Sequence, residues 1–396
     1  MDFTFLDYSF NPETSLATFR YQGKEDIIFT EKIEFSPITT EYNKETLNNA
    51  LFLAFIILGT SYYKTNPTPK INLKTPITEK QATFFNYIYQ EGLSQFAFEN
   101  NLKRENLAHF TGAKSEDPSL KPIETTDKTL VLLSGGKDSL LMTEKIHSKN
   151  KPYEILYISS QESYPKIIDE FKTPLIIKRH IDKENLSRAS GLNGHVPVTL
   201  INEALAIIEA ILIGCDKIEL GIGKEGLEPH TYIDNLPVNH QWSKTAEAQT
   251  LLKNYVETYI AKNLHIDSIL ENYTELEIAK EFTEKCWNKY GNKFSSCNVA
   301  NYKQDANNRE LKWCGKCAKC ANSYLLFAPF VKSEDQQKLF GHDLFSDPEM
   351  STIFKGLLGI DGIIKPFECV ASTDELRWAY QNKLPGYDNL PFEVKN

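Results

Sequence analysis

Apolar and polar residues show two different periodicities in the first hundred residues. Residues 1 to about 40 alternate in short runs, as in Leu16-Ala17-Thr18-Phe19-Arg20-Tyr21, which predicts a small antiparallel sheet. From Thr46 to about Tyr63 and from Thr78 to about Phe98, apolar residues recur at helical spacing. The most apolar run, Leu51 to Leu58, is far shorter than the roughly 20 residues that span a bilayer. We therefore expect a buried helix there and no membrane insertion.

The pattern changes after residues 113–127, a polar stretch with prolines and no periodicity, which predicts a linker. Beyond it, short apolar segments alternate with helical patterns, notably from Pro197 to Ile213. The segments expected to be strands are Thr129–Leu133, Tyr153–Ser159, Pro174–Ile181 and Lys217–Ile222. Apolar runs of this kind are typical of strands buried on both faces of a parallel sheet. The order predicts an α/β fold with a doubly wound parallel sheet and right-handed crossovers.

These patterns divide the chain into four parts. We predict a small N-terminal α+β domain over residues 1–112 and a linker over residues 113–127. A nucleotide-type α/β core follows over residues 128–240. The last part, residues 241–396, reads as mostly helical and turns irregular around a group of cysteines.

Composition narrows the class of protein. The chain has 396 residues, of which 41% are hydrophobic and 24% charged, which excludes a fibrous or wholly disordered protein. Its net charge of −9 argues against a surface built to hold nucleic acid, although a local basic pocket stays possible. The N-terminus lacks the basic and apolar regions of a signal peptide, so we expect a cytoplasmic protein. In a reducing compartment, seven cysteines favour metal ligation, a reactive thiol or core packing over disulfides.

A glycine-rich turn follows the first strand of the core and precedes a helical pattern. Its sequence is Ser134-Gly135-Gly136-Lys137-Asp138-Ser139. The glycines let the backbone approach a phosphate, and the N–H groups of the first helical turn point at it. Ser134 and Ser139 can donate hydrogen bonds, Lys137 adds a charge, and Asp138 could hold the loop or Mg²⁺. The Walker spacing is absent, which excludes a P-loop GTPase or kinase. A plain turn without a ligand is the alternative that the full string disfavours.

The cysteines suggest a metal site. Cys314, Cys317 and Cys320 form a CxxCxxC string, and Cys297 lies upstream. Two-residue gaps supply the tight turns that four thiolates need around tetrahedral Zn²⁺. A closed site of this kind stabilises the fold and does not catalyse. An iron–sulfur cluster shares the spacing and stays an alternative. Cys215 and Cys286 are expected in the core.

The glycine-rich string resembles the PP-loop of the N-type ATP pyrophosphatases. That resemblance implies binding of ATP and Mg²⁺, release of AMP and pyrophosphate, and an adenylated carbonyl or carboxylate. A four-cysteine zinc site after such a core is similar to that of the 7-cyano-7-deazaguanine synthases, but those chains are much shorter.

Three further strings favour a closer resemblance: Asn193-Gly194-His195-Val196-Pro197-Val198-Thr199, His240-Gln241-Trp242-Ser243-Lys244 and Lys365-Pro366-Phe367-Glu368-Cys369-Val370. Together with the glycine-rich turn and Trp313-Cys314-Gly315, they resemble the MurL family of UDP-N-acetyl-α-D-muramoyl-L-alanyl-L-glutamate epimerases. The resemblance implies inversion of the terminal L-Glu of a UDP-linked muramyl dipeptide to D-Glu in peptidoglycan precursor synthesis. It also implies coupling to cleavage of ATP into AMP and pyrophosphate.

The implied coupling has a physical reason. Removing the Cα proton beside a free carboxylate sets two negative charges side by side, a repulsion of about 4 kcal/mol at 4 Å and an effective dielectric of 20. A barrier raised by this amount slows the reaction by a factor of about a thousand. Adenylation removes the carboxylate charge and leaves a carbonyl that can accept the carbanion as an enolate.

Candidates for the proton transfer are His195, His240, Glu228, His230 and Cys369, because general bases titrate near working pH or have a shifted pKa. Glu228 and His230 flank Pro229 in an expected loop, and we predict a solvated surface position for both.

Several positive side chains could meet an anionic substrate, although each reads more simply as a surface residue. They are Arg179, Arg188 and Lys244. Trp242 is expected in the core.

Two other functions remain open at this point. One is a PP-loop enzyme similar to the 7-cyano-7-deazaguanine synthases or to tRNA-modifying enzymes, which adenylates a carboxylate or a nucleobase. The other is a nucleotide-binding regulator without turnover.

Overall fold

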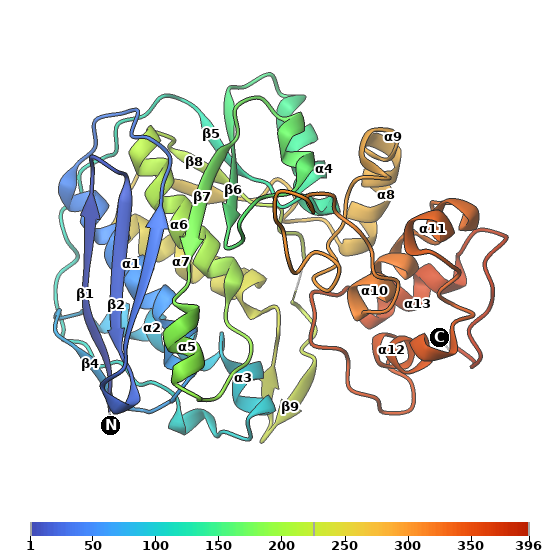
Figure 1. The fold of residues 1–396 in the computed structure, drawn as a ribbon, viewed down its shortest axis with the longest axis horizontal. Helices are drawn as coiled ribbons and strands as arrows, with labels where there is room; N and C mark the ends of the chain where they lie inside the picture. Colours follow the sequence, from blue (N-terminus) through green and yellow to red (C-terminus); the bar gives the residue numbers. More distant parts are fainter. Residues whose placement is uncertain (1, 225, 395–396) are drawn as a thin grey trace.

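The computed structural model describes residues 2–224 and 226–394, and within them one nine-stranded sheet organises the fold (Figure 1). The strand order is β11-β8-β5-β6-β7-β3-β2-β1-β4. Five strands form its parallel part: β5 (Thr129–Leu132), β6 (Tyr153–Ser159), β7 (Leu175–His180), β8 (Lys217–Glu219) and β11 (His265–Asp267). Chain order runs outward from β5 to β7, then restarts with β8 on the other side of β5. This is the arrangement of doubly wound α/β proteins, whose ligands bind where the order reverses.

The N-terminal strands continue the same sheet. They are β1 (Phe3–Asn11), β2 (Leu16–Gln22), β3 (Ile28–Glu34) and β4 (Ile71–Leu73). The expected antiparallel sheet is confirmed, since β1 pairs with β2 and β2 pairs with β3. β4 joins β1 in parallel, and β3 pairs antiparallel with β7, with Lys32 opposite His180. The change of pattern at residues 113–127 therefore marks a long irregular connection and not a break in the sheet.

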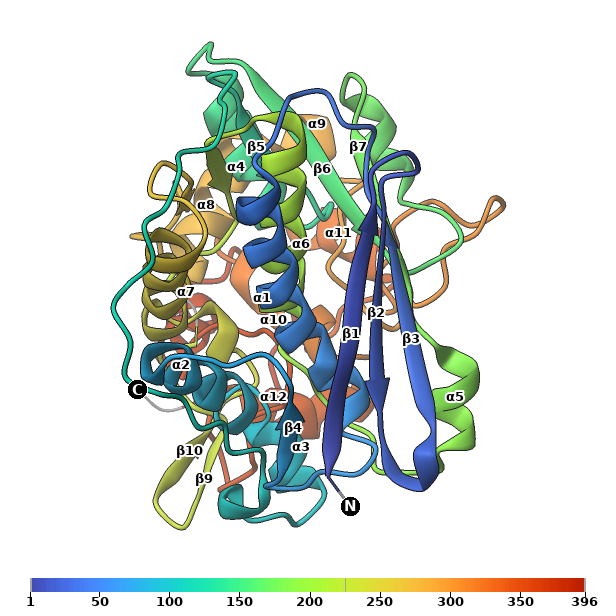
Figure 2. The ribbon, with the colours of Figure 1, turned by 90° about the vertical axis from the view of Figure 1, so that its left-hand side faces the viewer.

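Helices cover both faces of the sheet. On β5, Leu130 and its neighbour Val131 point to opposite faces and belong to two separate buried clusters. The first cluster includes α1 (Lys44–Tyr63) and α6 (Val198–Ile213), which lie side by side (Figure 2). Residues 51–58 of α1 are all buried, as expected. No helix in the described part of the chain is long and apolar enough to cross a membrane.

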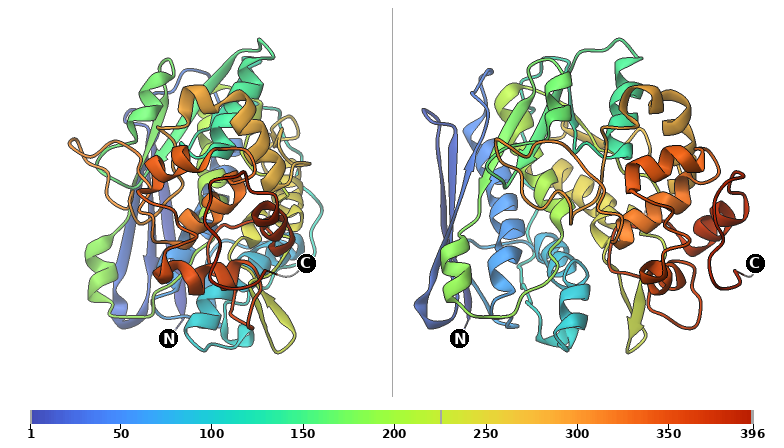
Figure 3. Two further views of the ribbon diagram at one scale, coloured as in Figure 1. Left: turned by 90° about the vertical axis from the view of Figure 1, so that its right-hand side faces the viewer. Right: turned by 45° about the vertical axis from the view of Figure 1, so that its right-hand side comes forward.

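The remaining helices complete two layers. The first face also carries α2 (Glu79–Gln90) and α7 (Ala246–Tyr259), and the second carries α4 (Lys137–His147) and α8 (Glu275–Lys285). The C-terminal helices α10 (Ala318–Phe327), α11 (Ser333–Phe340), α12 (Ser351–Leu357) and α13 (Thr373–Gln381) gather at the end of the molecule away from β1 and β2 (Figures 1 and 3). Three short helices are α3 (Ser94–Glu99), α5 (Lys183–Arg188) and α9 (Trp287–Tyr290).

The helical reading beyond Asn239 is confirmed, with β11 as an exception that the pattern did not predict. A hairpin of β9 (Thr231–Ile233) and β10 (Leu236–Val238) was not predicted either. Each of these strands has only three residues, too few for an alternation to show. The core positions expected for Cys215, Cys286 and Trp242 are confirmed, since all three are buried.

Candidate active site and cysteine cluster

The glycine-rich turn connects β5 to α4 at the point where strand order reverses. The Ser139 hydroxyl accepts hydrogen bonds from the backbone N–H groups of Ser134 (3.1 Å) and Gly135 (3.2 Å), which folds the turn back on the helix. Gly135 has a φ of +88°, and a Cβ there would lie 2.6 Å from Leu311 Cδ1. Gly136 is the N-cap of α4 and makes no side-chain capping bond with a described residue. The first-turn N–H groups are therefore available to an anion.

The chain after β8 packs directly on this turn. A Cβ on Gly221 would lie 2.9 Å from the backbone nitrogen of Ser139. The start of α4 is thus enclosed between the ends of β5 and β8, the two strands on either side of the reversal point.

Lys137 is buried between two carboxylates. Its Nζ lies 2.6 Å from Asp138 Oδ1 and also forms an ion pair with Glu275, the first residue of α8. Burial lowers the pKa of Lys137, but the two carboxylates outweigh it and raise the pKa above its usual value. Sequence reasoning missed Glu275. The capping box that Thr274 forms with Glu277 could have located the start of α8, but not its contact with Lys137.

Three histidines, His230 and His240 from one loop region and His195 from an earlier one, form a cluster near α3. The ring centroids of His195 and His240 are 4.3 Å apart, and those of His230 and His240 are 5.9 Å apart. The structure thus brings His195 and His240 together, and it corrects the expectation for His230, which is 5% exposed and not on the surface. The position is buried because Phe367 stacks on the His230 ring at 5.4 Å.

Hydrogen bonds assign different tasks to His230 and His240. His230 donates from Nε2 to the Glu368 carbonyl (3.0 Å) and accepts the His240 backbone N–H at Nδ1 (3.4 Å). Both of its ring nitrogens are thus engaged with backbone groups and have a structural role. His240 donates from Nδ1 to Gln95 Oε1 (2.6 Å). Its Nε2 then carries the lone pair.

Two residues of α3 support this arrangement. Gln95 is buried, and its amide nitrogen donates to Glu99 Oε1 (2.8 Å), which fixes the orientation of the amide. Neither Gln95 nor Glu99 was a candidate from sequence, because nothing in the local pattern relates α3 to a loop far along the chain.

The cluster is held in its neutral form. Burial is the main cause that lowers the pKa of His195 to about 4, with His230 and Lys64 adding to it. Burial likewise lowers the pKa of His240 to about 2, helped by the neighbouring histidines. Neutral imidazoles at pH 7 are proton acceptors, and His240 Nε2 is the acceptor that the hydrogen bonds identify.

The segment containing Cys369 closes over the histidines. Its neighbours Phe367 and Glu368 make the contacts with His230 described above, and Cys369 itself is half-buried. The expectation that Glu228 is solvated also needs correction. The carboxylate of Glu228 is half-buried, pairs with Lys365 Nζ at 2.8 Å and accepts from the Thr373 backbone N–H at 2.8 Å, which fixes this segment from below.

Among the charged candidates, Arg179 differs from its expected surface position. It is 9% exposed, forms an ion pair with Glu31 and donates to Ser61 Oγ at 2.9 Å. Its charge is thus neutralised inside the fold.

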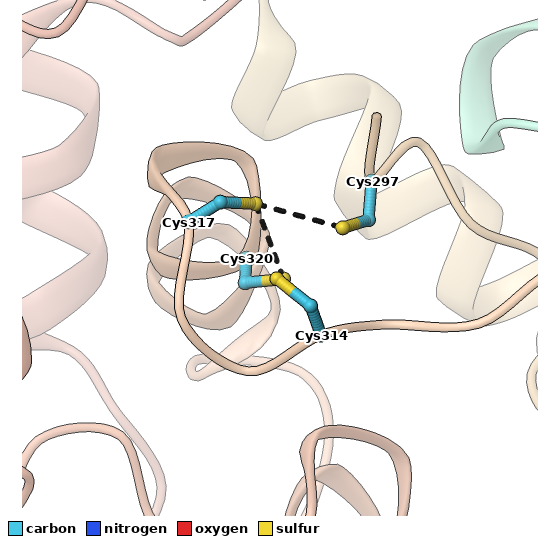
Figure 4. Close-up of side chains that lie close together, drawn as sticks. All are labelled: Cys297, Cys314, Cys317 and Cys320. Atoms are coloured by element: carbon cyan, nitrogen blue, oxygen red, sulfur yellow. Dashed lines mark hydrogen bonds between the residues drawn. The ribbon is translucent and has the colours of Figure 1, made fainter. Parts of the chain in front are cut away.

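The four predicted metal-ligating cysteines converge (Figure 4). The Sγ atoms of Cys297, Cys314, Cys317 and Cys320 all lie within 4.8 Å of one another. The Sγ–Sγ distances are 3.6 Å between Cys297 and Cys317, 3.7 Å between Cys314 and Cys320, and 3.5 Å between Cys317 and Cys320. A tetrahedral ion with bonds of about 2.3 Å sets its sulfurs about 3.8 Å apart. The cluster therefore fits one tetrahedral ion such as zinc, whereas an iron–sulfur cluster, with inorganic sulfide between its irons, needs wider spacing.

Chain neighbours of the four cysteines contact both candidate sites. The backbone N–H of Ser295 donates to the Gly135 carbonyl (3.3 Å), which ties the cluster to the glycine-rich turn. On its other side, Asn298 Nδ2 donates to Glu368 Oε2 (3.3 Å), and Lys319 Nζ lies 3.9 Å from the same atom. A rigid cluster would hold the turn and the histidines in a fixed relation.

Fold and site together define a class: a doubly wound α/β protein with a glycine-rich turn at the reversal point, a buried cluster of neutral histidines and a four-cysteine site. Comparison with known families is more specific. The family model described as the MurL N-terminal domain matches residues 1–269, and that of the MurL C-terminal domain matches residues 293–385. The chain belongs to the MurL family.

Curated relatives cover almost the whole chain. A protein of Salinispora tropica named UDP-N-acetyl-alpha-D-muramoyl-L-alanyl-L-glutamate epimerase is 31% identical over 94% of this chain and 82% of its own length. Proteins with the same name from a Micromonospora species and from Xanthomonas oryzae pv. oryzae are 30% and 29% identical over 94% and 95% of this chain, and 84% of each relative.

Proposed function

We propose that this protein inverts the terminal L-Glu of UDP-MurNAc-L-Ala-L-Glu to D-Glu through an acyl-adenylate, with release of AMP and pyrophosphate. Family membership supports the reaction. The observation that carries the chemistry is the neutral histidine pair, in which His240 Nδ1–H is bound by Gln95 and Nε2 carries the lone pair that can accept a proton. The deazaguanine-type and regulatory alternatives receive no support from these features.

The glycine-rich turn is the proposed ATP site. The backbone of Gly135 and Gly136 and the first turn of α4 suit phosphate oxygens, and the Ser134 and Ser139 hydroxyls add donors. Bound ATP supplies the adenylyl group that neutralises the substrate carboxylate. Lys137 and Asp138 form a preassembled charge pair beside the turn, in which Asp138 is the group suited to Mg²⁺.

The histidines act on one face of Cα. Rings only 4.3 Å apart leave no room for a carbon atom between them, so His195 and His240 cannot serve opposite faces. We assign the proton transfer on one face to His240 Nε2 with His195 beside it. Cys369, whose segment covers the cluster, is the proposed partner on the other face.

The cysteine cluster is proposed to hold structural zinc. Four thiolates complete the coordination of the ion, so no position remains for substrate. Its task is to stabilise the segment that contacts both the turn and the histidines.

The test is incubation of the purified protein with ATP, Mg²⁺ and UDP-MurNAc-L-Ala-L-Glu in deuterated water. We expect AMP together with D-Glu that carries deuterium at Cα. In His240→Gln the deuterium exchange should fall by about 10²–10⁴, while His147→Gln, an exposed histidine of α4, keeps the parent rate. ATP cleavage with a deazaguanine carboxylate, and none with the muramyl dipeptide, would overturn the proposal.

A further inference from the structure

A basic cleft lies at the carboxyl end of the parallel sheet, beyond the glycine-rich turn. Its volume is about 570 Å³, and its walls come from the ends of β6 and β7, the start of α5 and the loop of residues 302–304. Of the candidates discussed above, only Arg179 lines it, and its guanidinium is paired with Glu31. Since β5 and β7 are separated by β6 alone, two strand spacings of about 4.8 Å place the cleft roughly 10 Å from the turn.

Positive charge dominates the side chains that face this cleft. Lys178, Lys183 and Lys303 are exposed in its wall, and Glu162 is the acidic residue there. His180 also lines it and is paired with Glu34 at 2.8 Å. Lys303 Nζ is 3.9 Å from Asp305. A concentration of lysines on a chain with a net charge of −9 marks a place where an anion is attracted.

A buried amide indicates that the cleft accepts a ligand. Gln304 lines it and is only 3% exposed, yet neither its Oε1 nor its Nε2 has a hydrogen-bond partner among the described residues. Buried polar groups are almost always paired, because an unpaired one is costly. Both amide atoms are almost completely enclosed, so a ligand with donors and acceptors would pair with them once the Gln304 side chain turns toward the cleft. Beside it, Tyr302 is 80% exposed, an aromatic face on which a planar ring can stack.

We propose that this cleft binds the uridine diphosphate group of the substrate, with the lysines on the diphosphate and Gln304 and Tyr302 on the nucleoside. This inference rests on the proposed function. Two extended residues span about 7 Å, and the sugar adds to that length. The substrate can therefore reach from the cleft to the turn, where its carboxylate would be adenylated.

The decisive experiment measures binding of free UDP by calorimetry to the full chain. We expect the Lys178→Gln/Lys183→Gln double variant to lose at least tenfold in UDP affinity. Its ATP affinity should stay within twofold of the parent. Lys149→Gln, a change of an exposed lysine just beyond the C-terminal end of α4, should alter neither. Unchanged UDP affinity in the double variant overturns the proposal. A loss of ATP affinity instead of UDP affinity also overturns it and assigns the cleft to the polyphosphate of ATP.

Gln304→Leu separates ligand binding from folding. Removal of an unpaired buried amide should not lower the melting temperature, so a loss of UDP affinity in this variant reports the ligand contact. In turnover, the KM for the UDP-linked substrate should rise while kcat is kept. If the parent epimerises its substrate and these variants keep the parent KM, the assignment of UDP to this cleft is wrong, whereas the proposed function is upheld. If the parent binds UDP in this cleft but does not epimerise the substrate, the proposed function is wrong, whereas the assignment of UDP to the cleft is upheld.

Discussion

At the scale of single residues, the site depends on burial more than on residue type. His240 and His147 are chemically the same, but His147 is exposed on α4, whereas His240 is enclosed by other histidines and bonded to Gln95. Enclosure disfavours the charged imidazolium, and the bond to Gln95 selects the tautomer. The surroundings of His240 therefore keep it neutral and decide which nitrogen carries the lone pair, and they also make it a weaker base than an ordinary histidine.

The lowered histidine pKa values predict an unusual pH profile. A base works in its neutral form, and His195 and His240 stay neutral down to pH of about 4 and about 2. We expect kcat/KM, which reports on the free enzyme, to stay flat as pH falls from 8 to 5. A profile that loses half its value near pH 6.5, the ordinary pKa of histidine, would contradict the assignment.

Lys137 provides a prediction about stability. Glu275→Ala removes one of the two carboxylates that accompany this buried charge. Breaking a buried ion pair should lower the free energy of unfolding by about 3 kcal/mol. Urea denaturation measures it, with Glu284→Ala, an exposed position of the same helix, as the control expected to stay within about 0.5 kcal/mol of the parent. Equal stability of the two variants would show that Glu275 does not support Lys137.

At the scale of elements, the sequence pattern predicted the strands and helices whose formation depends on neighbouring residues. The apolar runs located β5, β6 and β7 and the long helices α1 and α6, because burial on both faces requires continuous apolar sequence. The glycine-rich turn and the CxxCxxC string were visible for the same reason, since each acts within a few neighbouring residues.

Contacts between distant segments were not predictable in this way. Glu275 meets Lys137, and Gln95 meets His240, across more than a hundred residues of chain in each case. His230 was misplaced because a loop of mixed composition looks exposed until Phe367 covers it. Single-sequence patterns do not carry that information.

The cysteine cluster gives a prediction about metal. Metal analysis of the purified chain should find about one equivalent of zinc, and Cys317→Ala should lose it and several kcal/mol of stability. Cys286→Ala changes a buried cysteine of the same half that lies outside the cluster, so it should keep the zinc. A Cys317→Ala protein as stable as the parent would refute a structural role.

At the scale of the whole molecule, the shared sheet joins the two ends of the N-terminal family match. The pairing of β3 with β7 and the packing of α1 on α6 unite segments on either side of residues 113–127. Most residues of that connection are exposed. This connection joins the two parts covalently along the surface. The non-covalent contacts that hold them together come from the sheet and the core.

Cutting the connection should therefore leave the molecule assembled. With a protease site inserted between Lys114 and Lys121, we expect both fragments to co-elute in size-exclusion chromatography after cleavage and to separate only in urea. Expressed alone, residues 128–396 should be insoluble, because the edge of β7 and the inner face of α6 are uncovered. Two soluble fragments that part without denaturant would support independent folding of the N-terminal segment.

The edges of the sheet determine where a second copy of the protein could add a strand. An exposed strand edge is a template on which another chain can add a strand, and long edges invite aggregation. Here the outermost strands, β4 and β11, have three residues each. So short an edge gives a second molecule few backbone groups to pair with at β4 and β11. However, β4 covers only Phe3–Phe5 of β1, and among the described strands residues 7–11 of β1 pair with β2 alone. A strand added to this sheet would therefore have to pair with the second half of β1.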